Sequence, residues 1–379
     1  MINGLRLKQV RELLGLTQSE LALKLSVTQS TVAYLEGGYL QPSQEMLGNI
    51  CDCTGFPQSF FERVEITDFP YGSLLYRSRT SVDASEKTRA NRYGQFMFEV
   101  AEKLARRLKY RHFTFPKGRI DPITAARVTR SNLGYTPDRP IDDLIYELEK
   151  NGVFIFKSPV LFPKVDAFSV WGGYDDKKPV IVLTGDAPAD RVRFSVAHEL
   201  GHLILHSTLF GDLQEFEREA DLFASELLLP EETMSRLVVE PFTLIAAARI
   251  RAEWKVSIQA IVRRAHDLQL ISDSTYKSLF VQISQQKKKI QMLASSELPE
   301  RPRSLRGMAE AIYGKKIKYK QFSADTDFPI YLLKMFMEAQ ASQEEYTRKG
   351  QPEQHGKILE FPSFDKISSN SGDSDALEG

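Results

Sequence analysis

The stretch "AHELGHLILH", residues 197–206, decides the fold because it contains three histidines at intervals of four residues. This interval places His198 and His202 on one face of a helix, where two imidazoles can share one Zn²⁺ ion. Glu199 follows the first histidine and can lean over a metal-bound water, which is the position of a general base for amide hydrolysis. The HExxH pattern therefore predicts a zinc-dependent peptidase. A helix that buries its leucines and exposes its histidines is the alternative interpretation.

The sequence on either side of this helix favours the catalytic interpretation. A strand is expected just before it, in "KPVIVLT" (178–184), and a zinc peptidase needs a nearby strand edge to hold an extended substrate. An acidic helix is expected after it, in "QEFEREADLFASELLLP" (214–230). One face of this acidic helix is apolar and is formed by Ala220, Phe223, Ala224, Leu227 and Leu228.

Glu219 borders the apolar face of the acidic helix, so we predict it as the third protein ligand, with the fourth position left for water. Glu215, one turn earlier, is the competing candidate, and Glu217 and Asp221 are expected to point elsewhere. His206 lies two helical turns from the first histidine, a rise of about 12 Å. We therefore expect it to cap the helix or to orient a ligand through a hydrogen bond, not to join the same tetrahedral site.

Residues 5–61 have the pattern of several short helices. A capping box, "TQSE" (17–20), predicts the start of the second helix, and Ser26 is the expected N-cap of a third helix that ends at Gly37–Gly38. A fourth helix is expected to begin near Ser43.

Residues 62–122 differ in charge from the rest of the chain. Between Arg77 and Arg111 there are ten basic and four acidic residues, a regional charge of +6. Apolar residues recur there at helical spacing, which predicts one long amphipathic helix that connects two domains and carries a basic face.

Residues 123–290 alternate between helical and strand patterns, as in an α+β domain. Strands are predicted in "GVFIF" (152–156), "AFSVWGGY" (167–174) and "KPVIVLT". The last stretch, "PSFDKISSNSGDSDALEG" (362–379), is polar and acidic, so it is expected to be disordered. The expected regions are an N-terminal domain (1–65), a basic helical connector (66–122), an α+β domain (123–284), a C-terminal helical region (285–362) and an acidic tail (363–379).

Composition adds little about partners, because 50 basic and 50 acidic residues cancel. The N-terminus lacks the apolar region of a signal peptide, and apolar runs are far shorter than the roughly 18–20 residues of a membrane span. The two cysteines, Cys51 and Cys53, are expected to be buried and reduced. We therefore expect a cytoplasmic protein with no membrane partner.

Three segments resemble the ImmA/IrrE family of bacterial zinc metallopeptidases: "RVRFSVAHELGHLILH" (191–206), "EREADLFASELLLP" (217–230) and "VSIQAIVRRAHDLQLIS" (256–272). The resemblance covers about residues 125–280. It implies zinc held by His198, His202 and Glu219, with Glu199 as the catalytic base. It also implies a protein substrate such as a helix-turn-helix repressor, in the control of mobile elements, stress responses or toxin–antitoxin modules.

The segment "GLTQSELALKLSVTQSTVAYLEGGYLQPS" (15–43) resembles the Xre type of helix-turn-helix, the lambda repressor and Cro-like fold. The whole chain is thus expected to be multi-domain and mainly α, with a lambda-repressor-like helical bundle followed by an α+β zinc-peptidase domain. By analogy the third helix reads base edges in operator DNA and the start of the second helix touches phosphate. The residues implied in these contacts are Gln18, Thr28, Gln29, Ser30, Thr31 and Tyr34.

The N-terminal domain has an unfavourable charge for DNA binding. Residues 1–60 contain four basic and five acidic residues, and phosphate contacts normally dominate affinity for DNA. Weak binding is therefore expected unless the protein forms a homodimer or the basic connector helps. A protein-interaction module that does not bind DNA is the alternative for this domain.

Three hypotheses follow for the whole chain. The first is a transcriptional regulator fused to a zinc endopeptidase that cleaves a repressor, an antitoxin or itself. The second is a regulator without proteolysis, in which the zinc domain is a sensor or scaffold. The third is a protease activated by nucleic acid, in which the basic connector binds a single strand. The intact HExxH favours the first, because a structural zinc site does not need Glu199.

Overall fold

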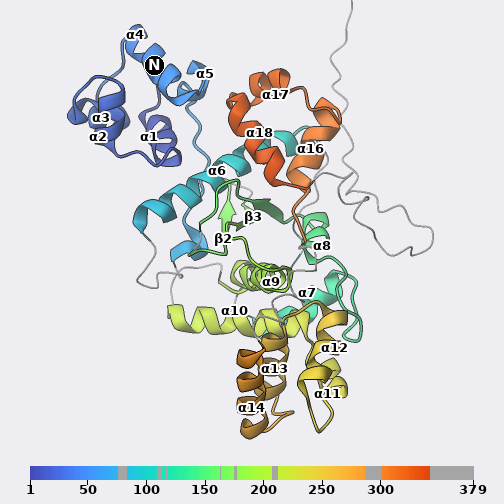
Figure 1. Cartoon of the computed structure of the whole chain (residues 1–379). Helices are drawn as coiled ribbons and strands as arrows, with labels where there is room; N and C mark the ends of the chain where they lie inside the picture. The colour runs from blue at the N-terminus through green and yellow to red at the C-terminus, as the bar shows by residue number, and fades with distance from the viewer. Residues whose placement is uncertain are drawn as a thin grey trace, which may run out of the picture.

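The computed structural model describes residues 1–75, 83–108, 113, 115, 118, 120–162, 164–174, 177–206, 212–286 and 300–341. Within these ranges the chain is mainly helical, with one three-stranded sheet (Figure 1). This confirms the expectation of a mainly α, multi-domain protein with an α+β domain. The acidic tail, 363–379, lies outside the described residues. None of the described helices is long and apolar enough to cross a membrane.

The N-terminal bundle consists of short helices, of which the first four begin at polar N-cap residues and the fifth follows Pro57. They are α1 (Gly4–Leu13), α2 (Gln18–Lys24), α3 (Gln29–Glu36), α4 (Gln44–Thr54) and α5 (Gln58–Phe61). The capping box of Thr17 and Glu20 is present, and Ser43 caps α4, both as predicted.

The prediction that Ser26 caps α3 was wrong. Ser26 has a φ of 55°, so its backbone closes the end of α2 in the left-handed conformation. Thr28 caps α3 instead, because its side chain accepts a hydrogen bond from the backbone N–H of Thr31.

The long helix predicted in the connector is α6 (Ala84–Ala105). It packs against the N-terminal bundle and against the C-terminal helices α16 (Ser304–Tyr313), α17 (Tyr319–Thr326) and α18 (Ile330–Ala339). Rings from three regions meet there: Phe60 lies 5.5 Å from Phe96 and 5.3 Å from Phe328, measured between centroids. The N-terminal bundle, α6 and the C-terminal helices therefore share one hydrophobic core.

The sheet contains β1 (Phe154–Lys157), β2 (Ala167–Gly172) and β3 (Lys178–Leu183), in the order β1-β3-β2. β1 is parallel to β3, and β2 is antiparallel to β3. β3, the strand predicted just before the helix that contains the HExxH sequence, is therefore the central strand of the sheet. Of the two edge strands, β2 is the one that packs against that helix. Side chains alternate along β3: Val180 and Val182 join the core around α6, whereas Ile181 and Leu183 join a second core.

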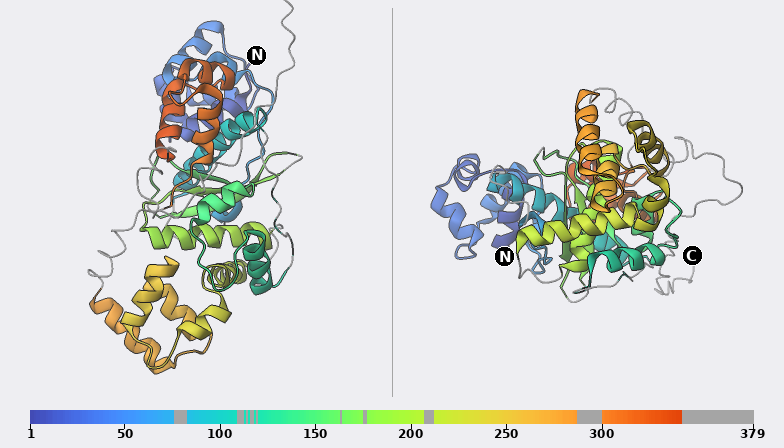
Figure 2. Two further views of the ribbon diagram at one scale, coloured as in Figure 1. Left: turned by 90° about the vertical axis from the view of Figure 1, so that its right-hand side faces the viewer. Right: turned by 90° about the horizontal axis from the view of Figure 1, so that it is seen from below.

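The second core lies on the opposite face of the sheet and contains the histidine helix, α9 (Ala189–Leu205), and the acidic helix, α10 (Leu213–Leu228). Figures 1 and 2 show α9 and α10 as successive layers below the sheet. The remaining helices of this part are α7 (Pro122–Asn132), α8 (Leu144–Lys150), α11 (Glu231–Leu237), α12 (Leu244–Trp254), α13 (Ile258–Asp267) and α14 (Asp273–Gln285). A short 3₁₀ turn, η1 (Gly72–Leu75), lies against β2.

Candidate functional site

Two helices cross closely at the HExxH sequence because of a glycine. A Cβ atom on Gly201 would lie 3.1 Å from the ring of Phe223 and 3.2 Å from the Cα of Ala220, so a larger residue would push α10 away from α9. The close crossing buries His198, Glu199 and His202 and brings acidic side chains of α10 over the two imidazoles.

The residues brought together are His198, His202 and Glu217. The two Nε2 atoms lie 3.1 Å apart, and the Glu217 carboxylate oxygens lie 3.3 Å from Nε2 of His202 and 3.6 Å from Nε2 of His198. Ligands held about 2.0–2.1 Å from one tetrahedral zinc are separated by roughly 3.4 Å, so the observed spacing fits. Glu217 Oε1 is also buried, and apart from its 3.3 Å contact with Nε2 of His202 it accepts no hydrogen bond from the described residues, so a bound cation would satisfy it.

The structure does not bring Glu219 to this cluster, although the sequence reasoning predicted it there. Glu217 precedes Ala220 by three residues and Ala224 by seven, so it shares the helix face that packs on α9. Glu219 is rotated off that face, and its carboxylate lies 2.9 Å from Nε2 of His206. The competing candidate, Glu215, is exposed and pairs with Arg218.

The remaining ring nitrogens of the two histidines are also engaged. Nδ1 of His198 lies 2.8 Å from the carboxylate of Asp221, which was expected to point elsewhere. Nδ1 of His202 lies 2.9 Å from Nδ1 of His206, and Nε2 of His206 in turn lies within hydrogen-bond distance of the Glu219 carboxylate. A carboxylate that accepts from Nδ1 fixes the ring and leaves Nε2 with its lone pair free for a metal. His206 thus has the orienting position expected for it, and it also forms the end of α9.

Charge in the site favours a cation. Burial lowers the pKa of His198, but the hydrogen bond that its Nδ1–H donates to Asp221 and its contact with the Glu217 carboxylate outweigh burial and raise the pKa to about 9. Burial raises the pKa of Glu217, but its contacts with the two imidazoles outweigh this and lower the pKa. Glu217 is therefore ionised near neutral pH, and the site stabilises positive charge.

Glu199 is completely buried and is held by two serine hydroxyls. Its Oε2 accepts hydrogen bonds from Ser73 Oγ at 2.7 Å and from Ser169 Oγ at 2.8 Å. Ser169 lies on β2, whereas Ser73 comes from η1, far earlier in the chain. The sequence reasoning missed both serines.

The predicted DNA-reading residues lie in α2, in α3 and at the N-cap of α3, and Figure 1 shows these two helices on the far side of α1 from α6. Thr28, Gln29, Ser30 and Tyr34 are exposed, and Gln18 and Thr31 are half-buried. Two of the side chains are held in place: Gln29 donates a hydrogen bond to Gln18, and Gln18 donates to Glu36.

Comparison with known families identifies both parts. Residues 7–57 match the family described as helix-turn-helix, and residues 148–266 match the IrrE N-terminal-like domain. The chain joins a helix-turn-helix domain to an IrrE N-terminal-like domain. The two resemblances seen in the sequence are thereby confirmed. No curated protein matches the chain.

The matched ranges place the functions on the structure. The IrrE N-terminal-like range contains the sheet, α9 and α10, and this family implies a hydrolase of the metallopeptidase type with a metal cofactor, typically zinc. The helix-turn-helix range contains α2 and α3 and implies DNA binding. Ser73 lies in neither range, although its hydroxyl contacts Glu199.

Three basic residues of the connector form ion pairs with other parts of the protein, whereas Arg77, Arg79, Lys109 and Arg111 lie outside the described residues. Arg92 pairs with Glu12 of α1, Lys103 with Asp327, and Arg107 with Asp325. These pairs hold α6 to the helix-turn-helix domain and to the C-terminal helices. The charges of these three side chains are therefore not free to bind a single strand of nucleic acid.

Proposed function

We propose that the chain is a DNA-binding transcriptional regulator with a zinc endopeptidase domain. The observation that carries the peptidase function is the convergence of three donor atoms, from His198, His202 and Glu217, beside the buried carboxylate of Glu199. These three residues would hold the metal, and Glu217 replaces Glu219 in the ligand set that we propose. Zinc, when bound, supplies Lewis-acid activation of water and of the scissile carbonyl.

The chain's own residues would perform the remaining tasks. Glu199 takes a proton from the attacking water and returns it to the leaving amine, as a general base and then a general acid. Asp221 orients His198, and the pair of His206 and Glu219 orients His202, so both rings present Nε2 to the same point. The edge of β2 offers backbone groups to which an extended peptide can add as a further strand.

The helix-turn-helix domain would bring this activity to an operator. We propose that α3 enters the major groove, with Gln29 reading a base edge and Gln18 near phosphate. Because residues 1–60 carry a net charge of −1 and Arg92 and Lys103 of α6 are paired within the protein, we propose that a homodimer supplies the affinity that one copy lacks. A repressor, an antitoxin or the chain itself is the proposed protein substrate, within a stress, mobile-element or toxin–antitoxin circuit.

The test of the catalytic role is Glu199→Gln in the full-length, zinc-loaded protein. The substitution keeps the size of the side chain and leaves all three proposed ligands intact, so zinc content and fold should not change. Hydrolysis of fluorescein-labelled casein, or of the natural substrate, should fall by about 10²–10⁴-fold because an amide is not a useful base near pH 7. Unchanged hydrolysis in a folded, zinc-loaded mutant would show that Glu199 is not the base.

A further inference from the structure

The segment that joins the helix-turn-helix domain to α6 crosses the edge of the peptidase sheet. We call residues 66–75 the strap. The backbone N–H of Gly173 donates to the carbonyl of Asp68 at 2.9 Å, and the N–H of Ser169 donates to Ser73 Oγ at 2.8 Å. Along the strap the contacts therefore run antiparallel to β2, as a peptide added to the sheet edge would run.

The strap also reaches the catalytic carboxylate. Ser73 is buried, and its Oγ both accepts from β2 and donates to Glu199. The approach is close: Gly72 has a φ of +54°, and a Cβ atom on it would lie 2.1 Å from the carbonyl oxygen of Ser169. Leu74 is completely buried, so the strap is packed in place.

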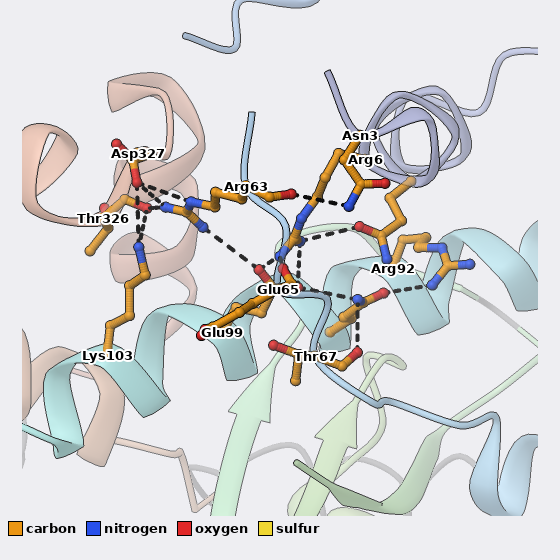
Figure 3. Close-up of polar contacts among 12 residues, drawn as sticks. Asn3, Arg6, Arg63, Glu65, Thr67, Arg92, Glu99, Lys103, Thr326 and Asp327 are labelled. Carbon is orange, nitrogen blue, oxygen red and sulfur yellow. Dashed lines mark hydrogen bonds and ion pairs between the residues drawn. The ribbon is translucent and has the colours of Figure 1, made fainter. Parts of the chain in front are cut away.

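The other end of the strap is tied to the helix-turn-helix domain and to α6 (Figure 3). Arg6 of α1 donates to the carbonyl of Glu65, just before the strap, and forms a buried pair with Glu99 of α6 at 2.8 Å. Gln95 and Asn91 of α6 donate to carbonyls of the strap, those of Thr67 and Pro70. The docking of α1 on α6 thus fixes where the strap begins.

We infer that the strap is a built-in occupant of the peptide-binding edge, which keeps the peptidase latent while the helix-turn-helix domain is docked on α6. The inference rests on the proposed peptidase function. An extended substrate needs the backbone amides of Ser169 in β2 and of Gly173 just after it, which the strap occupies, and it needs Glu199 free of the Ser73 hydroxyl. Both requirements are met only when the strap leaves the edge.

Gly72→Ala is the variant that tests this inference, because the added methyl group cannot fit against Ser169. Gly134→Ala is the matched control: Gly134 also has a positive φ, +81°, but its Cβ would meet nothing within 4 Å. Hydrogen–deuterium exchange of zinc-loaded, full-length protein should show the amides of Ser169 and Gly173 exchanging at least 10-fold faster in Gly72→Ala, with wild-type rates in Gly134→Ala. Wild-type exchange of these two amides in folded Gly72→Ala would overturn the inference.

Two functional measurements complete the test. Cleavage of labelled casein should rise at least 10-fold in Gly72→Ala and stay at the wild-type level in Gly134→Ala. A fluorescein-labelled peptide of residues 66–75 should bind Gly72→Ala, in a Glu199→Gln background that prevents its cleavage, and should not bind the Glu199→Gln protein with its strap intact. If Gly72→Ala does not fold, Ser73→Ala replaces it, since it removes the contact with Glu199 without a clash, and a rise of about 3-fold is then expected.

The outcomes separate the inference from the function on which it rests. Peptide binding to the opened variant without any casein cleavage would support the strap and refute the peptidase. Casein cleavage that depends on Glu199 but is equal in wild type and in an opened Gly72→Ala would support the peptidase and refute the strap. Failure of the peptide to bind the opened variant would also refute the strap.

Discussion

Replacing Glu217 by glutamine tests the proposed ligand set most directly, because it removes a charge and keeps the length of the side chain. The carboxylate oxygens of Glu217 lie 3.3 Å and 3.6 Å from the two Nε2 atoms, so no other described acid is placed to replace them. Structural zinc sites of zinc-finger peptides bind the ion with about 10–16 kcal/mol over four ligands, or roughly 2.5–4 kcal/mol for each. At about 1.4 kcal/mol per tenfold change, Glu217→Gln should weaken zinc binding by roughly 10²–10³-fold.

Two neighbouring acids of α10 give matched controls. Glu219 contacts His206, which contacts His202, so it acts on the metal through two hydrogen bonds. Loss of a direct partner of a ligand typically costs 10–100-fold in metal affinity, and we expect Glu219→Gln to cost about 10-fold or less. Glu215 is exposed and contacts Arg218, so Glu215→Gln should leave zinc affinity unchanged.

The measurement is competition for zinc against a chromophoric chelator at fixed pH, with circular dichroism to verify the fold of each variant. The expected order of loss is Glu217→Gln, then Glu219→Gln, then Glu215→Gln. A larger loss for Glu219→Gln than for Glu217→Gln would refute the reasoning from the α10 face. It would mean that Glu219 turns inward when zinc binds, as the sequence first suggested.

Three other substitutions have definite expectations. Gln29→Ala should reduce discrimination at one operator base pair by about 1–3 kcal/mol, measured with DNA variants in mobility-shift titrations; an unchanged preference would exclude Gln29 from base reading. Arg6→Met should lower the free energy of unfolding, measured in urea, by about 3 kcal/mol because Glu99 stays buried without its closest partner. The double variant Arg6→Met/Glu99→Leu should recover most of this loss. Equal losses in the single and the double variant would contradict an effect of the buried charge. Burial raises the pKa of Glu149 to about 7, so the stability that this protonated side chain contributes below about pH 4.5 is lost as the pH rises through 7. Glu149→Gln should therefore flatten the dependence of the melting temperature on pH. Identical pH profiles for the mutant and the wild type would contradict this role of Glu149.

Local features of the structure could be predicted from the sequence. The interval of four residues placed His198 and His202 on one face, and the capping box at Thr17 placed the start of α2, because both depend only on residues within one or two helical turns. Glu217 could also have been found in this way. It shares a face with Ala220 and Ala224, whereas the choice of Glu219 relied on proximity to the apolar stripe without fixing the angle around the helix.

Features that depend on long-range contacts could not be predicted. Ser73 contacts Glu199 across 126 positions of the chain, and no spacing rule connects them. The charge on α6 was visible in the sequence, but its partners Asp325 and Asp327 lie more than 200 residues later, so a surface for nucleic acid could not be distinguished from an internal interface.

The strap connects the helix-turn-helix domain to the proposed active site, which suggests why the two domains are joined in one chain. It begins where α1 contacts α6 through Arg6 and ends where Ser73 contacts Glu199. In the docked state α1 packs on α6, and in the undocked state it does not. A ligand of the helix-turn-helix domain can change the active site only if it binds these two states with different affinities, because a ligand with equal affinity for both does not change their relative populations. In Figure 1 α3 lies on the far side of α1 from α6, so DNA bound at α3, as we propose, would not reach the contact between α1 and α6. A partner that binds the surfaces of α1 and α6 that contact each other in the docked state would favour the undocked state, and would therefore release the strap.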